Sequence, residues 1–139
     1  MKTIYSLLYL IIFISVPCFS QNQQTPNKEK FSDQLFMDNN VYYQLKKYSN
    51  NNTILIVDPN NFLTRKELTY NNKELKILVV PEKKEGFDFL IKKIIINENL
   101  AFVAMWNKDS VTALCFYPFL SEFTPGKWVF EEITTRSIK

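Results

Sequence analysis

The chain has 139 residues, a formal net charge of +3 and no histidine. The absence of histidine removes the commonest general base and metal ligand, and it excludes nucleophilic triads of serine or cysteine with histidine. Basic residues are scattered and stand beside acids, so we expect no nucleic acid partner. Glycine occurs only at Gly86 and Gly126, which excludes glycine-rich phosphate loops. We therefore expect neither an enzyme nor a bound cofactor.

The N-terminus has the composition of a secretory signal peptide. Lys2 supplies a positive start, residues 4–19 are almost wholly apolar, and a polar run follows. The apolar stretch is shorter than the roughly 20 residues of a membrane span, and Pro17 closes it. We predict residues 1–20 as the signal, and a mature chain exported to the periplasm or outside the cell, without a stable membrane span. Lipidation at Cys18 and an uncleaved N-terminal anchor are the alternatives.

Cleavage after Ser20 would leave Cys115 as the only thiol, so a hydrophobic core and no intramolecular disulfide must hold the domain together. Cys115 lies in an apolar run and is predicted to be buried; pairing with another molecule's thiol, or reactivity, is the alternative. Residues 21–30 are almost wholly polar and are predicted to form a flexible leader. Residues 31–139 are predicted to form a single β-rich globular domain.

The first half of the domain is predicted to hold one short helix and several strands. We expect the helix over Ser32–Met37, then a break, then a strand over Val41–Tyr48, because that segment is rich in aromatic and β-branched residues. The asparagines at 50–52 predict a turn, and Asn51 would be a glycosylation site only in a eukaryotic secretory pathway. Ile54–Val57 is predicted to be a short apolar strand.

The next segment begins with a superficial likeness to a calcium loop at residues 58–62, which fails because the third ligand position is Phe62. Residues 62–70 alternate like a strand, although they also contain a helix capping box; we favour the strand. A turn at residues 71–72 is then predicted to lead into a strand over Leu75–Val80, which Pro81 ends.

Residues 87–134 are predicted to form a meander of four antiparallel strands. A two-residue turn at Glu98 and Asn99 would place Ile94 opposite Val103 and Ile91 opposite Trp106. The next hairpin would turn at residues 107–110, and the last strand would run over Lys127–Thr134. One face then collects Ile91, Ile95, Phe102, Ala104, Trp106, Val111, Ala113, Cys115 and Tyr117, and the other collects Ile94, Ile96, Ala101, Val103, Met105, Leu114 and Phe116.

Both faces of this meander are apolar, whereas an antiparallel sheet with one face in water should alternate apolar and polar residues. Something must therefore cover the second face. The aromatic residues Trp106, Tyr117, Trp128 and Phe130 are the candidate ligand or partner face, since exposed aromatics stack on ligands, but aromatics on strands also build cores. Adjacent acids at residues 131–132 would point to opposite faces and so cannot act on one substrate.

From Lys92 onward the layout resembles the C-terminal meander of nuclear-transport-factor-2-like and cystatin-like domains. The segments that carry the resemblance are KKIIINENLAFVAMW and GKWVFEEI, and the resemblance covers about a third of the chain. It implies an α+β fold with a curved antiparallel sheet wrapped on helices, often with a conical pocket or a dimer face. No catalytic residue carries over, and the long N-terminal helices of such domains are not evident at residues 31–71.

The expected function is that of a non-catalytic binding module for a protein or surface partner. A small-ligand pocket, which includes an enzyme on such a sheet, and a structural homodimer are the alternatives. A pocket would be lined by Trp106 or Tyr117, with a buried polar group converging on it, whereas a partner surface would be an exposed apolar patch.

Overall fold

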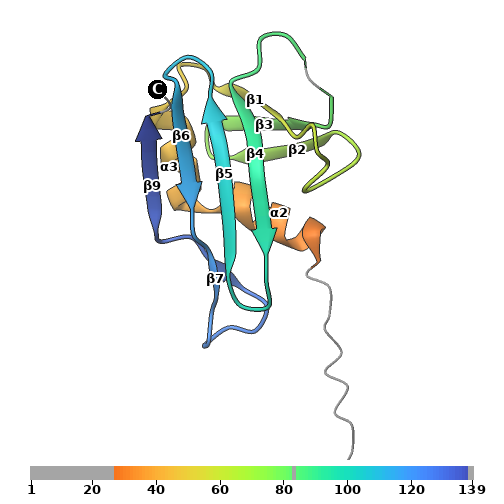
Figure 1. Ribbon diagram of the computed structural model, residues 1–139, viewed down its shortest axis with the longest axis vertical. Coiled ribbons are helices and arrows are strands. Elements are labelled where there is room, and N and C mark those ends of the chain that lie inside the picture. Colours follow the sequence, from red (N-terminus) through yellow and green to blue (C-terminus); the bar gives the residue numbers. More distant parts are fainter. Residues whose placement is uncertain (1–26, 83, 138–139) are drawn as a thin grey trace, which may run out of the picture.

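The computed structural model describes residues 27–82 and 84–137. Within these residues the chain forms a mixed α+β fold of two helices and a seven-stranded sheet, with a further two-stranded sheet at one end (Figure 1). The predicted signal peptide, Cys18 and residues 21–26 of the predicted leader lie outside the described residues. Neither described helix has the length and apolar character that a membrane crossing requires.

Two short helices open the described chain, and both begin at a capping side chain. The Asn27 side chain accepts a hydrogen bond from the Lys30 N–H (3.1 Å) at the start of α2 (Lys28–Met37). Asp38 separates the helices, and its carboxylate accepts the N–H groups of residues 40 and 41 at 2.8 and 3.2 Å to cap α3 (Asn39–Lys47). The first helix therefore starts inside the predicted leader, and it is longer than predicted.

The predicted strand over Val41–Tyr48 is wrong, because these residues belong to α3 and its end. Val41, Tyr42 and Leu45 are spaced to lie on one side of a helix, and all three are buried. Burial of this stripe, together with the cap at Asp38, outweighs the β propensity of the aromatic and β-branched residues.

The seven-stranded sheet is mixed, because a strand from the first half is inserted into its middle. β1 (Thr53–Val57) runs parallel to both of its neighbours, β3 and β4, and the four other pairs are antiparallel. The remaining strands, in the sheet order β2-β3-β1-β4-β5-β6-β9, are β2 (Leu68–Asn72), β3 (Leu75–Val80), β4 (Phe89–Ile96), β5 (Ala101–Asn107), β6 (Thr112–Phe116) and β9 (Ile133–Ser137).

Two predictions for residues 58–72 need correction. Residues 62–67 form neither strand nor helix, and the strand β2 begins only at Leu68. The turn lies after Asn72 instead of at residues 71–72, with Lys73 in the left-handed region (φ 54°). The buried Asn72 side chain donates to the carbonyl oxygens of Phe36 (3.0 Å) and Asp38 (3.3 Å), so it ties β2 to the junction of the two helices.

The pairing of β4 with β5 follows the predicted turn for half of its length and then changes. Ile94 lies opposite Val103, as predicted, but the register shifts between Ile91 and Lys93, so that Ile91 lies opposite Met105. Lys92 is the extra residue of a β-bulge. The bulge turns Ile91 into the core, where it is fully buried, and its prediction as a partner of Trp106 on the other face is wrong.

The next hairpin is also displaced from its predicted register, by two residues. Trp106 pairs with Ala113 and not with Val111, because the loop covers residues 108–111. The Asn107 side-chain oxygen accepts hydrogen bonds from the Ser110 N–H (2.7 Å) and hydroxyl (2.8 Å), which fixes this longer loop. An even shift leaves the side chains of β6 on their predicted faces, whereas Val111, predicted to lie opposite Trp106, is in the loop.

The predicted last strand, Lys127–Thr134, is split. β8 (Trp128–Val129) pairs with β7 (Phe119–Leu120) in the small sheet, and β9 begins at Ile133. Helix side chains bind the backbone around β8. Gln34 accepts the Trp128 N–H at 2.7 Å and donates to the carbonyl oxygen of residue 126 at 2.9 Å, and Asn40 donates to the carbonyl oxygen of Phe130, between β8 and β9, at 3.1 Å.

The helices cover one side of the sheet only. In Figure 1 they lie behind the strands, and the viewer looks onto the other side. The main core fills the space between the two layers and includes the fully buried side chains of Phe31, Leu35, Phe36, Val41, Leu45, Ile54, Ile56, Ile77, Phe89, Ile91, Val103, Met105, Leu114 and Phe116.

Candidate functional site

The side of β4, β5, β6 and β9 that faces away from the helices is the candidate site, and we call it the open face. Residues paired across the strands form rows on it. Its members alternate along each strand with core residues. They are Leu90, Lys93, Ile95, Phe102, Ala104, Trp106, Ala113, Cys115, Tyr117, Thr134 and Arg136.

The open face is apolar and incompletely covered. Ile95 is 44% exposed, and Phe102, Trp106 and Tyr117 are half-buried, whereas Val103 and Met105 on the helix side of β5 are fully buried. The rings of Phe102 and Tyr117 lie 5.3 Å apart at their centroids. The rows with aromatic residues thus flank a central row in which Ala104, Cys115 and Thr134 are small and Lys93 stands at the β4 end.

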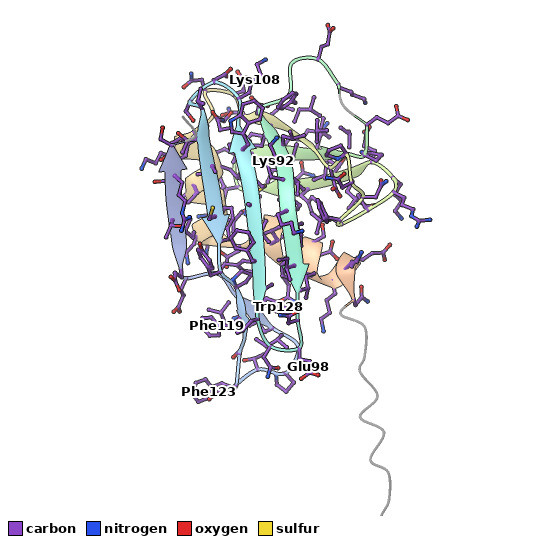
Figure 2. All side chains as sticks on the ribbon, viewed as in Figure 1. Lys92, Glu98, Lys108, Phe119, Phe123 and Trp128 are labelled. Carbon is purple, nitrogen blue, oxygen red and sulfur yellow. The ribbon has the colours of Figure 1, made fainter. Side chains whose placement is uncertain are left out.

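A small second core closes one end of the open face. Phe87 packs there with Val57 and Val80, and its ring lies 6.2 Å from that of Trp106. The Lys92 ammonium lies 5.1 Å from the centroid of the Trp106 ring, and that of Lys108 lies 5.7 Å from the Phe87 ring. Figure 2 shows both lysines at this end of the sheet. The bulge at Lys92 therefore places a cation beside the largest aromatic side chain of the face.

Two polar atoms of the open face have no hydrogen-bond partner among the described residues. They are the indole N–H of Trp106 and the hydroxyl of Thr134, and side chains around them shield both from water. An unpaired buried polar group costs about 1–3 kcal/mol. The helix layer holds one such atom as well, Oε1 of Gln44 on α3.

The charged side chains on β4 and β9 at the open face are positive, and the exposed Glu132 adds an acid next to Tyr117, whose N–H donates to the Glu132 carbonyl oxygen at 3.1 Å. Lys92 and Lys93 are exposed on β4, and Arg136 is exposed on β9. The two ion pairs found within residues 27–82 and 84–137 lie elsewhere, at Lys46–Glu74 (4.0 Å) and Lys84–Glu67 (3.6 Å). The cations at the open face thus have no carboxylate of the described chain within ion-pair distance.

The structure separates the four aromatic residues that the sequence suggests as one face. Trp106 and Tyr117 lie on the open face, whereas Trp128 and Phe130 are buried in the main core. The Phe31 ring of α2 lies 5.1 Å from the Trp128 ring, edge to face, and 5.9 Å from the Phe130 ring. Trp128 and Phe130 therefore hold the helix layer onto the C-terminal segment and are unavailable to a ligand.

Cys115 and the two adjacent acids bring no reactive group to the site. Cys115 is buried in the β6 ladder between Ala104 and Thr134, as predicted for a structural thiol. Glu131 and Glu132 are both exposed in the link between β8 and β9, outside the strand in which the sequence placed them.

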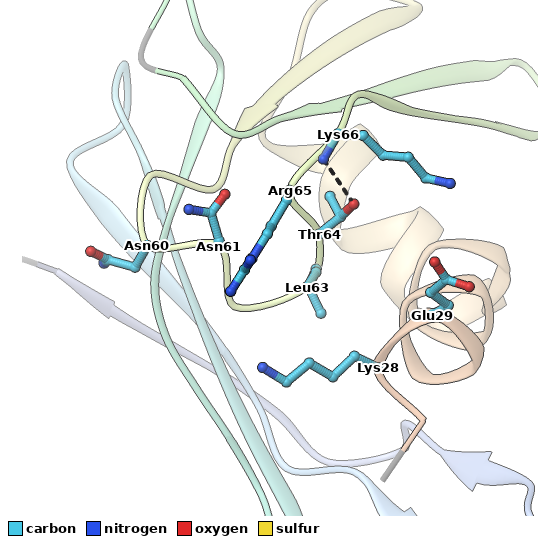
Figure 3. Close-up of a pocket in the computed structure, with 8 residues that line it drawn as sticks. All are labelled: Lys28, Glu29, Asn60, Asn61, Leu63, Thr64, Arg65 and Lys66. Atoms are coloured by element: carbon cyan, nitrogen blue, oxygen red, sulfur yellow. Dashed lines mark hydrogen bonds between the residues drawn. The ribbon is translucent and has the colours of Figure 1, made fainter. Parts of the chain in front are cut away.

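A pocket of about 620 Å³ lies elsewhere, between the start of α2 and residues 60–66 (Figure 3). Neither Trp106 nor Tyr117 lines it, in contrast to the pocket expected from the sequence. The loop that follows β1 is the segment with a superficial likeness to a calcium loop in the sequence. In the structure the Asp58 carboxylate of this loop accepts backbone N–H groups. The described part of the chain holds no group of three metal-ligating side chains.

Comparison with protein-family models, with characterised proteins and with solved structures finds no match to this chain. The resemblance to nuclear-transport-factor-2-like and cystatin-like domains therefore stays a prediction.

Proposed function

We propose that this chain is an exported, non-catalytic binding module, and that its open face docks a protein partner that carries carboxylates around an apolar centre. One observation carries the proposal: half of the seven-stranded sheet presents aromatic and aliphatic side chains on the side that the helices leave uncovered. The apolar segment at residues 4–19 supports export.

The size of the open face supports a transient interaction. Four strands spaced about 4.8 Å apart, over about six residues of 3.3 Å each, span roughly 400 Å². Apolar patches of about 300–600 Å² on monomers are often functional, but a stable complex usually buries about 800 Å² on each partner. We therefore expect a micromolar dissociation constant, unless the partner also contacts the Phe87 end.

The charges favour an acidic partner over a second copy of the chain. Lys93 and Arg136 flank the apolar centre and have no carboxylate of the described chain within ion-pair distance. A symmetric dimer through the same face would bring together Lys93 and Arg136 of both copies against one neighbouring acid from each copy, Glu132, and an excess of like charge in an interface disfavours a partner. Carboxylates on a different protein would instead steer association and pair with these cations.

The test is co-purification from the exporting cell with matched variants. Phe102→Ser and the double variant Lys93→Gln/Arg136→Gln change the open face, and Tyr43→Ser changes an exposed aromatic on α3, in the helix layer. We expect the two open-face variants to lose the captured protein and Tyr43→Ser to retain it. With the purified partner, the double charge variant should bind about tenfold more weakly, since each rim pair contributes up to about 1 kcal/mol.

The same experiment also shows the outcomes that would contradict the proposal. A partner retained by both open-face variants, or lost equally in Tyr43→Ser, would show that the face does not bind it. A dimer in size-exclusion chromatography that Phe102→Ser converts to a monomer would show that the occupant is a second copy.

A further inference from the structure

The pocket beside α2 is separate from the open face, and it is an open, mostly polar hollow with room for a small molecule. Its volume of about 620 Å³ lies within the range of about 300–1,000 Å³ that is typical of small-molecule sites. Eight residues line it, from the first turn of α2 and from the loop that follows β1: Lys28, Glu29, Asn60, Asn61, Leu63, Thr64, Arg65 and Lys66.

The loop wall of this pocket is held in place by a buried carboxylate. Asp58 is fully buried, and its two oxygens accept the N–H groups of Phe62 (3.0 Å), Leu63 (2.8 Å) and Thr64 (3.4 Å). Its own N–H donates to the Val80 carbonyl oxygen at 2.8 Å, which anchors the loop to β3. The lining side chains thus extend from a fixed backbone, and a site so preorganised binds without the cost of ordering a loop.

The pocket carries an excess of positive charge. Three of its lining residues are cations and one is an acid. In Figure 3 the side chains of Lys28 and Arg65 extend into the space between the helix and the loop, near Asn61, while Lys66 and Glu29 lie toward the other side. Among the described residues, no carboxylate lies within ion-pair distance of Lys28 or Arg65.

We propose that this pocket binds a small molecule through an oxyanion group, a phosphate, a sulfate or a carboxylate, held between Lys28 and Arg65. The planar guanidinium of Arg65 donates two parallel N–H bonds to such a group, and the Lys28 ammonium adds a compact positive charge. The Asn61 side-chain amide supplies a neutral donor beside them. A bare oxyanion fills only a fraction of the volume, so an organic body fits in the remaining space.

The test is an NMR titration of the purified chain with inorganic phosphate, sulfate and citrate, each at a constant ionic strength of about 50 mM, because salt screens exposed charges. We expect saturable shifts at the backbone amides of residues 60–66, with a dissociation constant of about 1 mM, the scale of a weak anion site. The relative affinities of the three anions decide which oxyanion the pocket prefers.

Matched variants make the test specific. Arg65→Gln and Lys28→Gln should each weaken binding by about tenfold, which is about 1.4 kcal/mol, and Lys108→Gln, an exposed lysine at the far end of β5, should leave it unchanged. Arg65 is exposed, so an unchanged circular dichroism spectrum is expected for its variant. The absence of saturable shifts up to about 8 mM anion, the most that citrate allows at this ionic strength and about eightfold above the expected constant, would overturn the proposal. An equal effect of Lys108→Gln would do the same.

Discussion

Removal of the Asp58 carboxylate should destabilise the protein strongly, although the residue lies in a loop. Asp58→Ala leaves the N–H groups of Phe62, Leu63 and Thr64 without their acceptor. Leu63 and Thr64 are buried, so water cannot fully replace the carboxylate there. A hydrogen bond to a charged group contributes about 1.5–3 kcal/mol, and the 3.4 Å bond contributes least, so we expect a loss of about 3–5 kcal/mol. That is a large part of the stability of a domain of this size.

Urea unfolding at pH 7, followed by circular dichroism, measures this loss. With a slope of about 1.5 kcal/mol/M, the midpoint should fall by about 2–3 M while the slope stays constant. Asp58→Asn keeps one acceptor oxygen and should lose less. The control is Asp109→Ala, an exposed carboxylate, which should change the free energy of unfolding by less than about 0.5 kcal/mol. If Asp58→Ala lies within about 1 kcal/mol of that control, the carboxylate does not hold the loop.

Three further predictions concern the core and the sheet. Burial raises the pKa of Tyr70 to about 12, against the opposing effect of its hydrogen bond with Ser32 (2.7 Å). An unfolded tyrosine loses its proton near pH 10, so above that pH the unfolded state binds fewer protons than the folded state. The free energy of unfolding should therefore fall by up to about 2.7 kcal/mol between pH 10 and 12. Urea unfolding from pH 8 to 12 should show a shallower decline of this free energy for Tyr70→Phe than for the unchanged protein, and equal slopes would contradict the raised pKa of Tyr70. Phe130→Ala should lower the free energy of unfolding in urea by about 3–5 kcal/mol. The control is Phe123→Ala, at a side chain that is 95% exposed, which should lower it by less than about 0.5 kcal/mol. Similar losses for the two variants would refute the core position of Phe130. Deletion of Lys92 should convert the bulge into a regular ladder, so the thermal unfolding midpoint should change by only a few degrees, which corresponds to about 1 kcal/mol or less. Failure of this deletion variant to fold would argue against the bulge.

Local patterns were enough to predict several parts of the fold from the sequence. The apolar runs Ile54–Val57 and Leu75–Val80 form strands, and the turn at Glu98 and Asn99 sets the pairing of Ile94 with Val103. The strands β4, β5 and β6 also have two apolar faces, and the helices cover one of them. These features depend on hydrophobic periodicity and turn chemistry, which short segments carry.

Tertiary contacts decided the parts that the sequence did not predict. The aromatic segment Val41–Tyr48 has the propensity of a strand, but its buried stripe is helical once the sheet lies against it. The bulge at Lys92 leaves no mark in the hydrophobic pattern, yet it moves Ile91 to the other face. The parallel insertion of β1 between β3 and β4 depends on long-range pairing, which local patterns do not encode.

The candidate site was predicted in part, for a similar reason. Trp106 and Tyr117 follow the alternation of their strands and lie on the face expected for them. The same rule placed Trp128 and Phe130 on that face as well. However, the side chains of Gln34 on α2 and Asn40 on α3 bind the backbone of these two residues and interrupt the strand, so both rings enter the core. The cations of the pocket are far apart in sequence, and only the fold brings them together.

The most direct test of the central claim is photo-crosslinking of the captured partner from single positions on the two sides of the molecule. A photoreactive phenylalanine analogue at Phe102 reports on the open face, and the same analogue at Tyr43 reports on the helix layer, where that side chain is 60% exposed. We predict a crosslinked partner from position 102 and none from position 43. A crosslink from position 43 without one from position 102 would contradict the assignment of the open face as the binding surface.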